Sequence, residues 1–184
     1  MPRVNFKELP REGRVWVFAS DRPLSSDESG RLLAEVDRFL DDWQAHGHPL
    51  RNARDWRDDR FLAIGIDPTA EQASGCSIDG LFRALQSFEK TLGASLVAGG
   101  RVFYRDAKGS AQVATRKDIA DLARAGVLSD ETPVFDTTVT EVGAWRERFV
   151  RPARDTWVAS LIANAQDSQR SSRSATNASS VRNG

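Results

Sequence analysis

The sequence predicts an α+β protein whose core is a ferredoxin-like split β-α-β domain, with two helices on one face of an antiparallel sheet. Two continuous apolar runs, residues 15–19 and 61–66, are rich in β-branched and aromatic residues and are typical of buried strands. An amphipathic helical pattern follows each run. With a polar strand at 50–56 and a last strand at 101–104, the order matches the β-α-β-β-α-β unit. A small parallel α/β sheet is the alternative.

The first helix is the most clearly marked element. Ser25 and Glu28 match a capping box, in which each side chain accepts a hydrogen bond from the backbone N–H of the other residue. Its apolar face then consists of Leu32, Leu33, Val36, Phe39, Leu40 and Trp43. Gly93 ends the second helix in the usual left-handed way. The apolar face of that helix consists of Ile78, Leu81, Phe82, Leu85, Phe88 and Leu92.

The weaker patterns after the last core strand divide the chain into three parts. Residues 1–105 form the core, and residues 106–164 form an extension packed on it, with a β-hairpin, a short helix and a second helix around Trp145. A small second domain is the alternative for this extension. Residues 165–184 are expected to be a disordered tail, because their polar composition cannot repay the entropy of ordering.

Composition excludes several classes of protein. The formal net charge of +0 gives no sign of a broad surface for nucleic acid or membrane. One cysteine rules out an internal disulfide framework and a multi-cysteine zinc site. Since the first residues lack the apolar segment of a signal peptide and no run approaches the roughly 20 apolar residues of a membrane span, we expect a cytoplasmic protein. Walker-type phosphate loops, G-x-S-x-G and H-E-x-x-H are also missing.

The turn at residues 73–79 holds the only cysteine and leads into the second helix. If Cys76 is the N-cap, Asp79 lies at N3; if Ser77 is the cap, Cys76 lies one residue outside the helix. In both cases the sulfur lies beside unpaired N–H groups and the positive end of the helix dipole, which favours the thiolate, whereas Asp79 opposes it. The same N–H groups can bind a phosphate or carboxylate. The alternative is that Gly75 forms the turn and Cys76 fills space in the core.

Two functions follow as hypotheses. The first is a binding protein whose turn holds a small anionic ligand or another protein, with contacts from Ser74, Gly75, Ser77, Trp56 and Arg60. The second is a thiol-dependent enzyme with Cys76 as the reactive group, assisted by Asp79 or His46. No cofactor can be named from the sequence.

The position of His46 decides whether it can assist Cys76. We expect both helices to run in the same direction along the sheet, which would place His46, after the first helix, at the opposite end from Cys76 unless the loop after Trp43 folds back. A mixed metal site is a further alternative, because His46 and His48 form a His-x-His pair that Cys76 or Asp67 would complete.

Four motifs carry a resemblance. They are Arg-Val-Trp-Val-Phe at 14–18, Trp-Gln-Ala-His-Gly at 43–47, Arg-Phe-Leu-Ala-Ile at 60–64 and the turn at 73–79. In these motifs the chain resembles an uncharacterised bacterial family whose members often bear the name "ABC transporter ATPase". The resemblance covers roughly the first hundred residues and implies a soluble bacterial protein without an assigned activity. The chain lacks the Walker A motif that the name demands. Residues 103–136 are similar to small GYF-like modules, although the hallmark tryptophan-tyrosine and glycine-proline residues are not matched.

Overall fold

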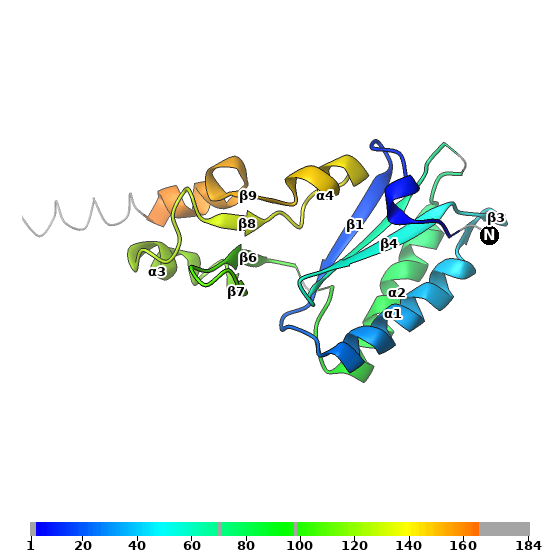
Figure 1. Cartoon of the computed structure of the whole chain (residues 1–184), viewed down its shortest axis with the longest axis horizontal. Helices are drawn as coiled ribbons and strands as arrows, with labels where there is room; N and C mark the ends of the chain where they lie inside the picture. Colours follow the sequence, from blue (N-terminus) through cyan, green and yellow to red (C-terminus); the bar gives the residue numbers. More distant parts are fainter. Residues whose placement is uncertain (1–2, 70, 98, 166–184) are drawn as a thin grey trace, which may run out of the picture. The chain divides into compact units, whose positions relative to one another are not determined.

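The computed structural model describes residues 3–69, 71–97 and 99–165 and divides the chain into two compact units. Unit 1 comprises residues 1–99 and 137–149, and unit 2 comprises residues 100–136 and 150–184. Both contain helices and antiparallel strands (Figure 1), so the α+β class is confirmed. The division differs from the predicted one, because unit 1 takes in residues 137–149.

A three-stranded antiparallel sheet forms the centre of unit 1. Its strands are β1 (Arg14–Ala19), β4 (Asn52–Arg57) and β5 (Phe61–Ile66), in the order β1-β5-β4. The hairpin between β4 and β5 turns through Asp58 and Asp59, whose φ angles are 52° and 48°. Positive φ at these positions suits tight β-hairpin turns, and aspartate tolerates it better than most residues. The predicted strands at 15–19, 50–56 and 61–66 are therefore present.

Two long helices, α1 (Ser26–Asp41) and α2 (Gly75–Leu92), cover one face of this sheet (Figure 1). Both begin and end close to the predicted positions, and the capping box of Ser25 and Glu28 is formed. Gly93 ends α2 in the left-handed conformation with a φ of 60°.

The two helices run in opposite directions. Trp43, just after α1, donates from Nε1 to the carbonyl of Ser77 in the first turn of α2 at 2.9 Å. At the other end, Arg22 donates to the carbonyl of Leu92 at 3.0 Å. The prediction of helices running in the same direction was wrong, because the β4–β5 hairpin reverses the chain between them.

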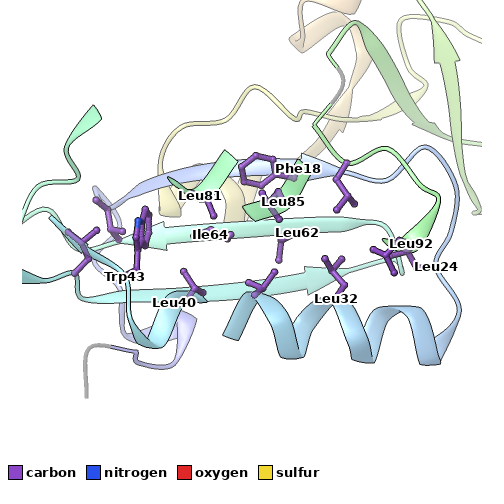
Figure 2. Packing of buried hydrophobic residues seen from close by; sticks show 14 of the residues in the cluster. Phe18, Leu24, Leu32, Leu40, Trp43, Leu62, Ile64, Leu81, Leu85 and Leu92 are labelled. Atoms are coloured by element: carbon purple, nitrogen blue, oxygen red, sulfur yellow. The ribbon is translucent and has the colours of Figure 1, made fainter. Parts of the chain in front are cut away.

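The main core of unit 1 lies between these helices and the sheet (Figure 2). Its fully buried members come from the predicted apolar positions and include Leu32, Leu40, Leu62, Ile64, Leu81 and Leu85. Each such side chain contributes about 1.5–3 kcal/mol of stabilisation by leaving water.

The opposite face of the sheet is also covered. The 3₁₀ helix η1 (Phe6–Glu8) and helix α4 (Val142–Arg148) lie there, and the Trp145 and Phe149 rings pack with centroids 4.0 Å apart. Phe149 in turn meets Phe61 of β5 at 5.1 Å. Helices therefore lie on both sides of the sheet, whereas the ferredoxin-like prediction left one face bare.

The predicted last core strand belongs to unit 2. Here β6 (Arg101–Arg105) is a central strand of a four-stranded antiparallel sheet. That sheet has the order β7-β6-β8-β9, and its other strands are β7 (Ala111–Thr115), β8 (Pro133–Phe135) and β9 (Val150–Pro152). The outer side of β1 is instead met by the carbonyls of Leu96 and Thr140, which accept from the N–H groups of Ala19 and Val15.

Consequently, the described strands do not complete the predicted four-stranded ferredoxin-like sheet. All named strand pairs are antiparallel, so the alternative of a parallel α/β sheet was wrong.

The smaller elements complete the description. In unit 1, β2 (Gln44–Ala45) and β3 (His48–Pro49) form a short hairpin. Unit 2 also contains α3 (Ile119–Arg124), η2 (Ala153–Asp155) and helical residues 158–165. Its core consists of Val102, Tyr104, Ala114, Ile119, Leu128, Val134, Ala153, Val158 and Ile162.

Apart from residue 165, the predicted tail at 165–184 lies outside the described residues. None of the helices in the described ranges combines the length and apolar character needed to cross a bilayer.

Two glycines give a matched test of this packing. A Cβ at Gly13 would lie 2.8 Å from the carbonyl oxygen of Ile66 and 2.9 Å from that of Pro10, and neither backbone atom can move freely. We expect Gly13→Ala to destabilise the protein by about 1–3 kcal/mol, as overpacking does. Gly30, inside α1, has open space around it, so Gly30→Ala should stabilise by about 0.5–1 kcal/mol.

Urea unfolding followed by circular dichroism measures both effects. Equal stabilities of the two glycine variants would contradict the packing described for the start of β1.

Candidate functional site

The start of α2 differs from both predicted forms. Ser74 is the N-cap, and its Oγ accepts a hydrogen bond from the N–H of Ser77 at 3.2 Å. The Oγ of Ser77 donates back to the carbonyl of Ser74 at 2.8 Å. Caps at Cys76 or Ser77 were therefore wrong, because the Ser74 hydroxyl accepts from the N–H of Ser77 and the helix already begins at Gly75. With this cap, Asp79 lies beyond N3 and forms no capping box.

Cys76 is exposed in the first turn of α2, as expected for an accessible sulfur. Asp79 is exposed as well, whereas Ser77 is buried and its carbonyl accepts the indole N–H of Trp43. In the described part of the chain, neither the Cys76 nor the Asp79 side chain makes a hydrogen bond or an ion pair. Nothing therefore orients Asp79 as a base toward the sulfur.

His46 lies in the turn of the β2–β3 hairpin, with a φ of 51° and an exposed side chain. Since Trp43 contacts Ser77, this hairpin lies at the same end of the sheet as the start of α2, not at the opposite end. Asp67 is held by Arg51 at 2.8 Å and by Thr69. Across the described residues, no group of three His, Cys, Asp or Glu side chains is placed to hold a metal ion.

Trp56 and Arg60, the two remaining predicted site residues, lie near the β4–β5 turn, at the end of the sheet away from Cys76. Trp56 is half-buried and packs against the core under α1 and α2. Arg60 is only 3% exposed. Burial lowers its pKa, and the charge of Asp21 opposes that shift. The sequence-predicted residues thus fall into two groups, one at each end of the sheet.

A cleft of about 660 Å³ lies along β4 and η1, away from these residues. Seven of its lining residues are charged, and they comprise five cations and two carboxylates. The cations are Arg3, Lys7, Arg54, Arg57 and Arg146, and the carboxylates are Asp37 and Asp55. The cleft therefore holds an excess of three positive charges in a chain whose formal net charge is +0.

Asp37 of α1 organises one side of the cleft. It accepts hydrogen bonds from Nε and Nη2 of Arg54 at 2.5 and 2.8 Å, and Arg3 approaches at 2.6 Å. Burial tends to raise the pKa of Asp37, but the hydrogen bonds and charges of Arg54 and Arg3 outweigh it and hold the pKa below its usual value. Arg3 also reaches Asp41 at 3.1 Å. The carboxylate therefore fixes two guanidinium groups at the rim.

Trp145 of α4 organises the other side. Asp55 accepts from the indole N–H of Trp145 and from Nε of Arg57, both at 2.8 Å. The guanidinium of Arg57 lies 4.4 Å from the centroid of the Trp145 ring and donates to the Trp145 carbonyl at 3.1 Å. Arg146 donates to the carbonyls of Phe6 and Leu9, the latter at 3.0 Å. These contacts hold both arginines in single orientations.

The hydrogen bonds made to described residues do not use all the donors. Nη1 of Arg54, Nη2 of Arg57 and the ammonium of Lys7 have no partner in the described ranges. Fixed guanidinium groups with free N–H bonds are suited to carboxylate and phosphate oxygens. The geometry of the cleft therefore fits an anion with several oxygens.

Comparison of the chain with protein-family models, curated proteins and solved structures gave no match. The resemblance to the family named "ABC transporter ATPase" stays a prediction. The candidate site therefore depends on the geometry of unit 1 alone.

Asp37 gives a pH-dependent test of the cleft. Because its folded pKa is lowered, its contribution to stability is present above its unfolded pKa and is lost as the pH falls through the folded pKa. We expect Asp37→Asn to lower the free energy of unfolding by about 1 kcal/mol at pH 7, with the difference from wild type shrinking toward pH 3. Asp41→Asn, which removes a single more exposed ion pair, should have a smaller effect.

Urea unfolding at several pH values measures this difference. A constant gap between Asp37→Asn and wild type from pH 7 to pH 3 would contradict the role given to the carboxylate.

Proposed function

We propose that unit 1 is a binding domain for an anionic ligand and that the cleft along η1 and β4 is its site. The observation that carries this proposal is the gathering of five cationic side chains around one cleft in a chain with no net charge. An anionic ligand is one of the two kinds of partner that the sequence hypothesis offered, the other being a protein. That hypothesis placed it at the turn of residues 73–79, and a role for this turn stays a prediction.

The cleft supports anion binding by preorganisation. Arg54, Arg57 and Arg146 are already fixed by hydrogen bonds and ring contacts, so a ligand does not have to order them on binding. Like charges this close repel one another, and a bound anion would relieve that repulsion. Because the cleft is open to solvent, salt should weaken the interaction.

Lys7 offers the cleanest variant for a test. Its side chain is exposed in η1 and has no partner among the described residues, so replacing it should leave the fold intact. We expect Lys7→Gln to weaken binding of pyrophosphate or citrate about three- to tenfold at low ionic strength, as the loss of one favourable charge does. Isothermal titration calorimetry of the full chain measures the dissociation constant.

Lys90→Gln is the matched control, because it removes the same charge from the exposed last turn of α2, outside the cleft. It should leave the dissociation constant unchanged. Equal losses in both variants, or the absence of saturable binding of either anion, would overturn the proposal.

The exposed sulfur of Cys76 favours a thiol-dependent enzyme as the second candidate function. It lies in the first turn of α2, where the backbone N–H groups of a helix start have no partner within the helix. The cytoplasmic location predicted from the sequence suits a reduced thiol.

Because the sulfur is exposed, we expect iodoacetamide to alkylate Cys76 in the native protein. Mass spectrometry measures the rate of this alkylation. A rate above that of free cysteine at pH 7 would support the enzyme, and a rate at or below it would support the binding protein alone. Cys76→Ser should bind pyrophosphate and citrate as the wild type does, because Cys76 does not line the cleft.

A further inference from the structure

One edge of β4 is open. β4 lies at the edge of the β1-β5-β4 sheet, and the carbonyl of its first residue, Asn52, accepts the N–H of Val4 at 2.9 Å. Alternate residues of a strand direct their backbone N–H and carbonyl groups to opposite sides. The backbone groups of Arg54 and Trp56 therefore point away from β5, as those of Asn52 do. Within residues 3–9, the β-bridge of Arg3 to Asn52 is the single pairing with β4, and the segment then turns into η1.

Beyond Asn52, the N–H and the carbonyl of Arg54 are left for a partner. In the described part of the chain, nothing bonds to the N–H or the carbonyl of Arg54. The N–H of Trp56 is occupied at 3.1 Å by the side chain of Asp55. An unpaired strand edge of this kind is a template for an added strand.

Cations flank this open edge on both faces of the sheet. Arg54 joins Asp37 of α1 on the helix-covered face, whereas Arg57 lies over the Trp145 ring on the face covered by α4. The cleft is lined from both faces, so it wraps around the edge of β4. A single small anion reaches the cations of one face, but successive side chains of an extended peptide alternate between the two faces.

We propose that the ligand of the cleft is an extended acidic peptide that adds to β4 as a further strand. Its backbone pairs with the N–H and carbonyl of Arg54, about 4.8 Å from β4. Asp or Glu side chains three residues apart in the peptide then lie opposite Arg54 on one face and opposite Arg57 on the other. This inference rests on the proposed function and names the partner of the same cleft.

The charges of the edge select this partner. A second copy of β4 would bring arginines against arginines, and like charges on neighbouring strands are destabilising. An acidic strand removes this repulsion and pairs the free N–H bonds of the guanidinium groups. The affinity is therefore expected to fall steeply with salt.

Two blocked hexaglutamate peptides of equal charge test the inference on the full chain. One contains only L residues, and the other alternates L and D residues, so that an extended chain directs all its carboxylates to one face. We expect the all-L peptide to bind about tenfold more tightly by fluorescence anisotropy. Hydrogen exchange at the amide of Arg54 should slow on binding, while exchange at Ala53, already paired with β5, should not change.

The outcomes separate this inference from the proposed function. Equal affinities of the two peptides with unchanged exchange at Arg54 would overturn the added strand and leave the anion-binding cleft in place. Binding of pyrophosphate or citrate without binding of either peptide would also overturn the added strand and leave the anion-binding cleft in place. If neither the peptides nor the small anions bind, both the inference and the proposed function fail.

Discussion

Burial of β5 on both faces is the constraint on which unit 1 depends. All six residues of this strand are buried, with Leu62 and Ile64 toward α1 and α2 and Phe61 toward α4. An antiparallel sheet can leave one face to water when its strands alternate apolar and polar residues. β5 has no such alternation, so the two long helices alone cannot complete the unit. Residues 137–149 are therefore part of the core and not an appendage.

The same packing determines the chemistry of the cleft. Trp145 is fully buried against Phe149, yet its indole N–H and ring hold Asp55 and Arg57 in place. The next residue, Arg146, ties η1 to α4 through two main-chain carbonyls. Core and cleft thus share one short helix. A substitution that loosens α4 would also displace the cations that line the cleft.

Local patterns predicted the elements of unit 1 well. Helical periodicity, the Ser25 capping box and the apolar run of β5 each depend only on residues that are close together in the sequence. They did not reveal which strand completes which sheet, since β6 carries the same apolar signal in either sheet. The cleft escaped prediction for a similar reason. Residues 3–7, β4 and Arg146 meet only in the folded chain, and arginine scattered over a polar sequence has no periodicity.

The chain passes between the two units three times, after residues 99, 136 and 149. During synthesis the ribosome has to release residue 149 before the Phe61 face of β5 is covered, although β1, α1, β4, β5 and α2 emerge much earlier. The nascent chain therefore exposes an apolar sheet face while residues 100–136 are being made. Chaperones act on surfaces of this kind. A fragment ending near residue 99 would keep η1 but lose α4 and Phe149, so the Phe61 end of that face would stay uncovered. Such a fragment would also lack Trp145 and Arg146 and is therefore unsuitable for isolating the cleft.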